Sequence, residues 1–147
     1  MMTAGRLSSL SCEWATPDAL FHELDDEFHF ALDVCATAEN TKCPAFFGAD
    51  EAWSALVKPW QGICWCNPPY GRGIGQWIQK AYESAQAGAT VVMLIPSRTD
   101  TRWWHDYVMK ASEIRFIRGR LKFGDAKWNA PFPSAVVVFR PTQEAAK

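Results

Sequence analysis

The sequence contains no long apolar run. Its uninterrupted apolar stretches are short, such as residues 135–139, whereas a helix needs roughly 20 apolar residues to cross a bilayer. This pattern predicts no membrane span. Residues 1–11 also lack the basic start, apolar stretch and small-residue cleavage site of a secretory signal. We therefore expect a cytoplasmic protein.

Paired cysteines are also missing. The chain has five cysteines, an odd number, and no repeated C-x-x-C spacing. The sequence therefore predicts neither a disulfide framework nor a metal site. Cys64 and Cys66 stand closest together; we expect them on opposite faces of a strand and interpret them as small buried thiols.

No internal repeat, linker or low-complexity segment interrupts the 147 residues, of which 48% are hydrophobic and 21% charged. Such values are typical of a globular chain, and the length fits one domain. We predict a disordered N-terminus over residues 1–12, a single domain over 13–140 and a frayed C-terminal tail over 141–147.

The chain has almost no net charge, but its charges are unevenly distributed. Residues 1–70 carry 3 basic and 10 acidic side chains, whereas residues 71–147 carry 12 basic and 6 acidic ones. Within residues 98–127, eight Lys and Arg side chains outnumber four Asp and Glu side chains. This segment is a candidate phosphate-binding surface. It is equally compatible with a solvated face, so charge alone assigns no function.

Apolar periodicity predicts the secondary structure. Thr16 and Pro17 mark a helix start, with a hydroxyl able to cap free amides and a proline suited to the first helical position. The same patterns predict strands at 29–34, 45–48, 62–66, 89–96, 113–117 and 134–139, and further helices at 74–85 and 103–111. This order predicts an α/β fold with a mostly parallel sheet and helices on both faces. Ligands of such sheets bind beyond the carboxyl ends of the strands.

The motif Asn67-Pro68-Pro69-Tyr70 directly follows a predicted buried strand. Two prolines fix the backbone and remove two amide donors, so the Pro68 carbonyl and the Asn67 side chain can both face outward as acceptors. Tyr70 adds a flat ring beside them. The alternative is a proline-rich turn whose tyrosine only packs.

Two acceptors beside a ring suit a planar amino group. The exocyclic amine of an aromatic base is a poor nucleophile, because its lone pair is delocalised into the ring. Acceptors that hold both N–H hydrogens favour the tetrahedral amine, whose lone pair is free to attack. The motif is similar to the catalytic loop of amino-group methyltransferases that use S-adenosylmethionine.

The resemblance extends over roughly residues 13–140 and is to the phage-type DNA adenine-N6 methyltransferases. Its motifs lie at residues 14–17, 32–36, 67–72, 77, 80–81, 96–101 and 130–134. The resemblance implies a single-domain, Rossmann-like methyltransferase fold and site-specific methylation of an adenine flipped out of double-stranded DNA. It further implies S-adenosylmethionine as cofactor, no metal, a bacterial host cytoplasm and a monomer or weak dimer.

The resemblance also assigns cofactor contacts. Thr16 and Pro17 match a motif that contacts the amino-acid end of the cofactor, although a simple helix cap explains them equally. Asp33 is expected to accept hydrogen bonds from the cofactor ammonium, with Val34, Cys35 and Ala36 lining the same pocket. For the ribose hydroxyls Asp50 is chosen over Glu39 and Glu51, against the alternative of a surface carboxylate. Unlike the wider methyltransferase pattern, the chain has no glycine-rich loop after the first strand.

The resemblance gives catalytic roles to Asn67, Pro68, Pro69 and Tyr70. Asn67 and Pro68 would hold the adenine amine while Tyr70 stacks on the flipped base, and the methyl group would pass directly to nitrogen. Phe132 is the candidate for the opposite wall of the base pocket, with Phe123 as second choice and core burial as the alternative.

Basic side chains are expected to grip the DNA backbone. The candidates are Arg72, Arg98, Arg102, Arg118, Arg120 and Lys122. Trp103 and Trp104 are interpreted as packing residues, and His105 as a structural or surface histidine. Two other functions remain open: methylation of RNA adenine or of a protein glutamine amide by the same loop, and a non-catalytic module that binds DNA or cofactor.

Overall fold

The computed structural model describes residues 16–36, 41–43, 45–48, 55–123 and 129–141. Their strands form one six-stranded sheet in the order β2-β1-β3-β4-β6-β5. The strands are β1 (Leu32–Ala36), β2 (Ala45–Gly48), β3 (Ile63–Cys66), β4 (Thr90–Pro96), β5 (Glu113–Phe116) and β6 (Ser134–Phe139). β2, β1, β3 and β4 pair in parallel, whereas β6 is antiparallel to both of its neighbours. The prediction of a mostly parallel sheet is confirmed.

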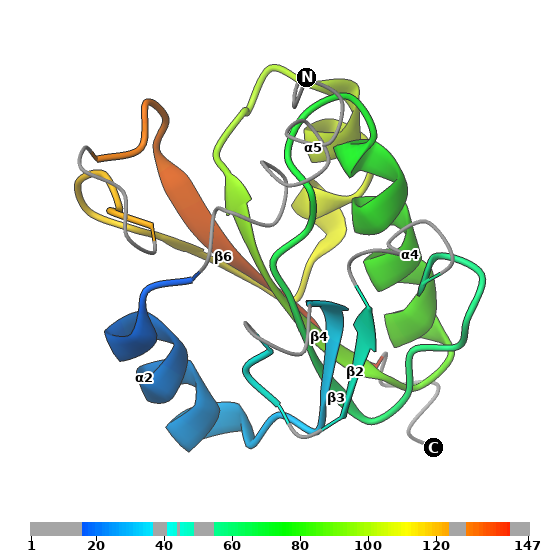
Figure 1. The fold of residues 1–147 in the computed structure, drawn as a ribbon. Coiled ribbons are helices and arrows are strands. Elements are labelled where there is room, and N and C mark those ends of the chain that lie inside the picture. The colour runs from blue at the N-terminus through cyan, green and yellow to red at the C-terminus, as the bar shows by residue number, and fades with distance from the viewer. Residues whose placement is uncertain (1–15, 37–40, 44, 49–54, 124–128, 142–147) are drawn as a thin grey trace, which may run out of the picture.

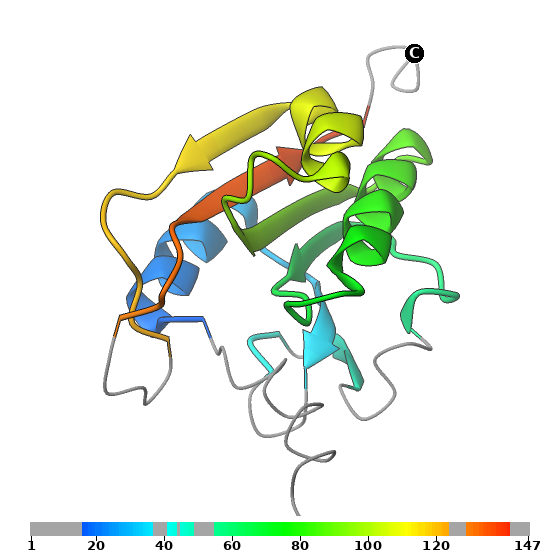
Figure 2. The same cartoon turned by 90° about the horizontal axis from the view of Figure 1, so that it is seen from above.

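Helices cover both faces of this sheet, as predicted (Figures 1 and 2). They are α2 (Asp18–Phe28), α4 (Ile74–Gln86), α5 (Arg102–Asp106) and the short 3-10 helix η2 (Val108–Lys110). α2 packs on one face, and α4 and α5 pack on the other. The single helix expected over 103–111 is therefore divided, because Tyr107 between α5 and η2 leaves the helical region of backbone conformation.

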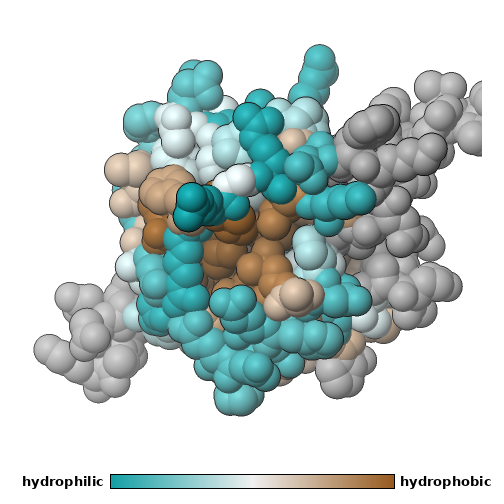
Figure 3. Space-filling view, turned by 90° about the vertical axis from the view of Figure 1, so that its left-hand side faces the viewer, coloured by the Kyte–Doolittle hydropathy of each residue, from teal (hydrophilic) through white to brown (hydrophobic). Residues whose placement is uncertain are grey.

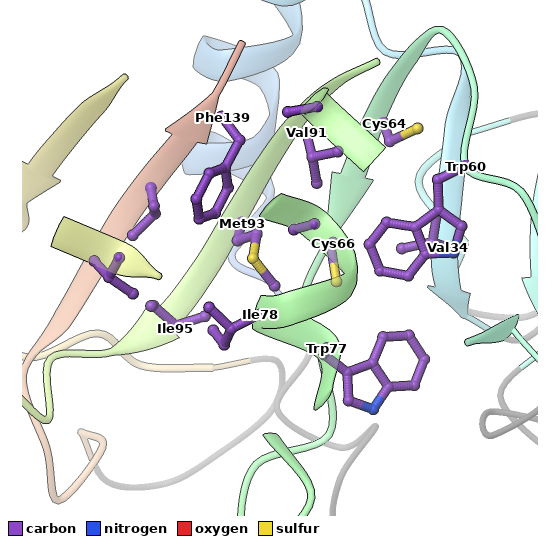
Figure 4. Close-up of a cluster of buried hydrophobic side chains, with 14 of the residues drawn as sticks. Val34, Trp60, Cys64, Cys66, Trp77, Ile78, Val91, Met93, Ile95 and Phe139 are labelled. Atoms are coloured by element: carbon purple, nitrogen blue, oxygen red, sulfur yellow. The ribbon is translucent and has the colours of Figure 1, made fainter. Parts of the chain in front are cut away.

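The core consists of two clusters separated by the sheet. Side chains alternate along β4, so that Met93 and Ile95 face α4, whereas Val92 and Leu94 face α2. Figure 4 shows the α4 side, where Ile78 of α4 lies against Met93 and Ile95. After Thr90, β4 is buried on both faces, which explains why residues 91–96 are all apolar.

The first strand differs from its prediction. β1 spans Leu32–Ala36, so Cys35 and Ala36 extend a strand that the sequence pattern ended at residue 34. Phe30 lies outside the strand and packs with Phe21 and Trp65 beneath α2. The apolar alternation that includes Phe30 therefore reflects packing beneath α2 and not membership of the strand.

Two further expectations are corrected. Thr16 does not cap α2: Pro17 is the N-cap residue and makes no side-chain capping bond. Cys64 and Cys66 do not point to opposite faces, because residues two apart on a strand share a face, and both lie in the α4-side cluster. Both are free and buried thiols.

One edge of the sheet gathers the ends of several strands. The carboxyl ends of β1, β3 and β4 lie at this edge. Because β6 is antiparallel to both β4 and β5, the start of β6 and the carboxyl end of β5 lie at the same edge. We refer to it as the carboxyl edge. The chain leaves β1 for β2 on one side and enters β3 on the other. Strand order thus reverses between β1 and β3, the position at which open α/β sheets form a ligand crevice.

Candidate active site at the carboxyl edge

The Asn-Pro-Pro-Tyr motif leaves the carboxyl end of β3 and meets the start of α2. Asn67 Nδ2 donates a hydrogen bond to Thr16 Oγ1 over 3.2 Å. Thr16 is buried, so this bond lies in the interior between segments 51 residues apart. It orients the amide of Asn67, so the hydroxyl predicted to cap a helix instead positions the first residue of the motif.

Tyr70 is held at both ends. Its hydroxyl donates to the Leu94 carbonyl over 3.1 Å, and its ring meets those of Phe132 and Phe123 edge to face at centroid distances of 5.5 and 6.2 Å. Burial raises the pKa of Tyr70 well above its usual value, so the phenol stays neutral near pH 7. We call Tyr70, Phe123 and Phe132 the aromatic cluster.

The structure brings both candidates for the second wall of the base pocket to Tyr70. Phe123 and Phe132 are buried and lie 6.1 Å apart, centroid to centroid. Core burial and a position beside Tyr70 are therefore both observed for each of them. Whether either ring contacts a base stays a prediction.

Arg98 lies over the aromatic cluster. Its guanidinium carbon is 5.7 Å from the centre of the Phe132 ring, a cation–π arrangement. The loop that carries it is fixed by Thr101, whose hydroxyl donates to the Arg98 carbonyl over 2.7 Å and accepts from the amide of Trp104 over 3.3 Å. The exposed charge of Arg98 is thus placed next to the candidate base pocket.

The topology collects all six predicted DNA contacts at the carboxyl edge. Arg72 follows β3, Arg98 and Arg102 follow β4, and the others follow β5 before the chain returns to β6; they are Arg118, Arg120 and Lys122. All six side chains are exposed. Within the described ranges, the four ion pairs use Lys42, Arg115 and Arg140 as cations instead. The edge therefore offers positive charge that no described carboxylate neutralises by direct pairing.

Arg115 shows the contrast. It lies in the same basic segment of the sequence, yet its guanidinium contacts Glu27 at 2.7 Å and Glu113 at 2.6 Å. These carboxylates hold the pKa of Arg115 above its ordinary value. Arg115 is therefore already paired with two carboxylates and links α2 to β5, so it is not a candidate phosphate contact.

Figure 3 shows the side of the molecule on which α2 and the segments between β5 and β6 lie. Apolar side chains gather there in a hollow with a hydrophilic rim. Two other surface pockets, of about 540 Å³ each, lie at the opposite edge of the sheet. One includes Gly62 and Ala89, which precede β3 and β4, and the other includes Phe139 at the end of β6. Neither contains a predicted site residue.

Asp33 makes different contacts from those expected. It is 3% exposed, and its two carboxylate oxygens accept hydrogen bonds from the backbone amides of Cys35 and Lys42, each over 3.2 Å. Asp33 thus fastens the segment at residue 42 to the end of β1. Burial raises its pKa to about 6, and the two backbone hydrogen bonds oppose that rise. Binding of a cofactor ammonium by Asp33 stays a prediction.

The other predicted cofactor contacts lie nearby or outside the described residues. Val34, Cys35 and Ala36 are buried at the end of β1, and Pro17 is half-buried beside Thr16. Asp50 lies outside the described residues. In the part of the chain that the structure describes, no group of three or more His, Cys, Asp or Glu side chains is placed to hold a metal ion. No described helix is long and apolar enough to span a membrane.

Two functional groups were missed by the sequence analysis. The Leu94 carbonyl positions Tyr70, and the Lys42 amide binds Asp33. Both are backbone atoms, which every residue carries, so no residue type signals them. The sequence offered one hint: Asp33 is an acidic residue in an otherwise apolar strand, and a buried carboxylate needs a hydrogen-bond partner.

The pH dependence of folding tests the environment of Asp33. Because its folded pKa of about 6 exceeds the ordinary 3.8, the folded protein binds the proton more tightly than the unfolded chain. The stability from this group is present below pH 3.8 and is lost as pH rises through 6. In the wild type, this group should lower the unfolding free energy by up to about 3 kcal/mol across that window. We expect Asp33→Asn to abolish this fall.

Chemical denaturation at pH values from 4 to 7 measures this effect. The matched control is Asp26→Asn, which changes an exposed carboxylate on α2 and should retain the wild-type pH profile. Each variant is compared with the wild type, because other groups also change stability with pH. Arg115 lowers the pKa values of Glu27 and Glu113, so these two groups make the unfolding free energy rise with pH. Identical profiles for the two variants would show that Asp33 is not desolvated.

A mostly parallel α/β sheet with an Asn-Pro-Pro-Tyr loop, an aromatic cluster and, outside the described ion pairs, basic side chains at one edge is typical of an enzyme that modifies an amino group of a nucleic acid. Comparison with known proteins specifies it further. The sequence model of the family described as DNA N-6-adenine-methyltransferase (Dam) matches residues 6–145. The chain belongs to this family and is a DNA adenine-N6 methyltransferase.

Curated relatives agree with this assignment. The chain is 34% identical over 137 residues to a DNA N-6-adenine-methyltransferase of Haemophilus phage HP1, covering 87% of this chain and 78% of that protein. It is 30% identical over 112 residues to a DNA N-6-adenine-methyltransferase of Escherichia phage T1, covering 74% of this chain and 45% of that protein.

Proposed function

We propose that the protein transfers the methyl group of S-adenosylmethionine to the exocyclic N6 amine of an adenine that has left the DNA duplex. The observation that carries the proposal is that Asn67 and Tyr70 lie in one loop after β3 and that each is held by a hydrogen bond to a segment distant in the sequence. Asn67 is oriented by Thr16, and Tyr70 by the Leu94 carbonyl. The loop lies where strand order reverses, which supports a Rossmann-like methyltransferase fold with its ligands at that point.

The residues at the end of β1 fit the cofactor. Val34, Cys35 and Ala36 are small and buried, Asp33 places a carboxylate beneath them, and Thr16 lies at the Asn67 loop. A carboxylate and a hydroxyl suit a ligand that carries both an ammonium and hydroxyl groups. When bound, S-adenosylmethionine supplies a methyl group on a positively charged sulfonium.

The residues of the loop act on the target amine. Asn67 Oδ1 and the Pro68 carbonyl accept its two N–H bonds and favour the tetrahedral nitrogen. Tyr70 stacks on the base, and Phe132 or Phe123, whose rings meet that of Tyr70 edge to face, lines the same pocket beside it. With its N–H hydrogens held in this way, the lone pair of the amine would be free to attack; bound S-adenosylmethionine would supply the methyl group and keep the carbon–sulfur electron pair on its sulfur, and the nitrogen would then lose one proton to water.

Access to the loop requires the base to leave the helix. In a duplex the N6 amine is paired, whereas Asn67 lies beside buried residues at the sheet edge. Enzymes that modify a base atom hidden by pairing extrude that nucleotide into a pocket. The six cations that follow β3, β4 and β5, which form none of the ion pairs among the described residues, would bind the phosphates on either side and keep the DNA backbone in place. We propose residues 13–140 as the catalytic unit, acting as a monomer or weak dimer.

Methyl transfer to DNA tests the proposal directly. The protein is incubated with methyl-labelled S-adenosylmethionine and unmethylated duplex DNA, and the DNA is digested for nucleoside mass analysis. Label in N6-methyladenine is expected. Label in a cytosine derivative, or label that appears only when RNA or a glutamine peptide replaces the DNA, would contradict it.

A further inference from the structure

Phe116 is a large aromatic side chain left in solvent. It is 67% exposed, and the other exposed large hydrophobic residues of the described chain are Val57 and Met109. Val57 precedes β3 and Met109 precedes β5, so both belong to the opposite edge of the sheet. Phe116 is the last residue of β5 and lies at the carboxyl edge. Among the described large hydrophobic residues that are exposed, Phe116 is therefore the one at the same end of the strands as the Asn-Pro-Pro-Tyr loop.

The ring of Phe116 is supported from one side. Trp104 of α5 is 2% exposed, and the two rings stack at a centroid distance of 6.4 Å with 26° between their planes. β5 is the outermost strand of the sheet and pairs only with β6 among the described strands. One face of the Phe116 ring thus rests on a fixed indole, while most of its surface remains open.

Exposed arginines lie close to Phe116 and Trp104 along the chain. Arg118 follows Phe116 by two residues, and Arg102 precedes Trp104 by two in α5; both are exposed and outside the four described ion pairs. The nearest carboxylate of β5, Glu113, is engaged by Arg115 and Arg140. Asp106 at the end of α5 is exposed, so the surface is mixed there, but the cations lie toward the carboxyl edge.

A supported aromatic ring flanked by arginines matches the chemistry of a nucleotide chain. Arginines bind phosphate, and a flat ring stacks on any base. In an intact duplex every base is already stacked on both sides. When the target adenine leaves the helix, its neighbours lose a stacking partner, and an aromatic side chain can take its place.

We propose that Phe116 stacks on a DNA base that becomes exposed when the target adenine leaves the duplex. This inference rests on the proposed function, because it takes DNA as the ligand and extrusion as the event that frees the base. It adds a contact from the outer strand of the sheet to those of the Asn-Pro-Pro-Tyr loop and the basic side chains.

Binding of the full-length variants to labelled, unmethylated duplex DNA tests the proposal by fluorescence anisotropy. We expect Phe116→Ala to raise the Kd for DNA by about tenfold, the range for loss of one base–aromatic stack. Phe116→Leu should weaken binding similarly, because leucine is apolar but has no flat face, whereas Phe116→Trp should bind like the wild type. The matched control Met109→Ala removes an equally exposed apolar side chain at the opposite edge and should leave the Kd unchanged.

Two further readouts separate stacking from other roles. The slope of log Kd against log salt should stay as in the wild type for Phe116→Ala, since that slope counts phosphate contacts, and the thermal midpoint and cofactor affinity should also be retained. An unchanged Kd for Phe116→Ala would overturn the proposal. So would loss of self-association with unchanged DNA binding, which would identify a second copy of the chain as the occupant.

The proposed chemistry can fail separately. Binding is measured without turnover, so a Phe116 effect on Kd in a protein that yields no N6-methyladenine would count against the methyl transfer alone. Normal N6-methyladenine formation in Phe116→Ala, with the Kd and KM for DNA both unchanged, would count against the stacking contact alone.

Discussion

Asn67→Ala is expected to lower kcat for methyl transfer by about 10²- to 10³-fold, the loss seen when one preorganised hydrogen-bonding group is removed from a transition state. In the proposed mechanism the wild-type side chain accepts a hydrogen bond from the amine, and this bond strengthens as the nitrogen becomes tetrahedral. Alanine leaves that hydrogen without a partner in a buried loop. Because the interaction improves during the reaction, KM for DNA should change little while kcat falls.

Steady-state kinetics with labelled cofactor measure this effect, with the thermal midpoint as a check of folding. Asn67→Asp keeps an acceptor oxygen and should retain more activity than alanine. Thr16→Val removes the partner of Asn67 Nδ2 but none of the acceptors, so a smaller decrease, about tenfold, is expected from looser positioning. Gln79→Ala, an amide on the exposed face of α4, is the matched control. Full activity in Asn67→Ala would remove the amide from the mechanism.

Tyr70→Ala should have the second largest effect, whereas Tyr70→Phe should be mild. The phenylalanine variant keeps the ring against Phe132 and loses only the hydrogen bond to Leu94, a contribution of about 1 kcal/mol. The alanine variant removes the ring that would stack on the base, and we expect kcat/KM for DNA to fall by about 10- to 100-fold. Since the pKa of Tyr70 lies well above its usual value, neither variant should shift the pH optimum near neutrality.

Kinetics of both variants, together with Tyr82→Ala, check this prediction. Tyr82 is a partly buried tyrosine of α4 that packs on Phe139, so its removal should lower stability without a specific loss of activity. If Tyr70→Phe were as inactive as Tyr70→Ala, the hydroxyl rather than the ring would carry the function. Equal activity of all three variants would show that Tyr70 only packs within the loop and takes no part in catalysis.

Several elements followed from local patterns. The strand at 90–96, the strand at 134–139 and the helix at 74–86 have the predicted boundaries to within a residue. Each is a long segment whose apolar pattern matches the face or faces it buries. The Asn-Pro-Pro-Tyr loop was equally readable, because proline restricts the backbone through its own ring, whatever surrounds it.

Two of the errors, at Thr16 and Phe30, arose where a distant contact competed with a local pattern. Thr16 has the chemistry of a helix cap, but its hydroxyl accepts from Asn67 instead. Phe30 continues the alternation of β1, but it packs with Trp65 and Phe21 beneath α2. A single sequence contains both possibilities, and only the relative position of the elements chooses between them.

The sequence by itself determined the α/β order of elements, the reactive loop and the pool of basic side chains, because each of these is set by residue type and by neighbours along the chain. The tertiary structure decided which of those residues share a site. It joined Thr16 to Asn67 and Tyr70 to Phe123 and Phe132. It also brought to one edge arginines that form none of the described ion pairs, whereas Arg115 is paired with two carboxylates. Strand direction is the physical reason: the parallel strands and the reversed β6 bring the segments after β3, β4 and β5 to one edge, a relation between residues that no local pattern contains.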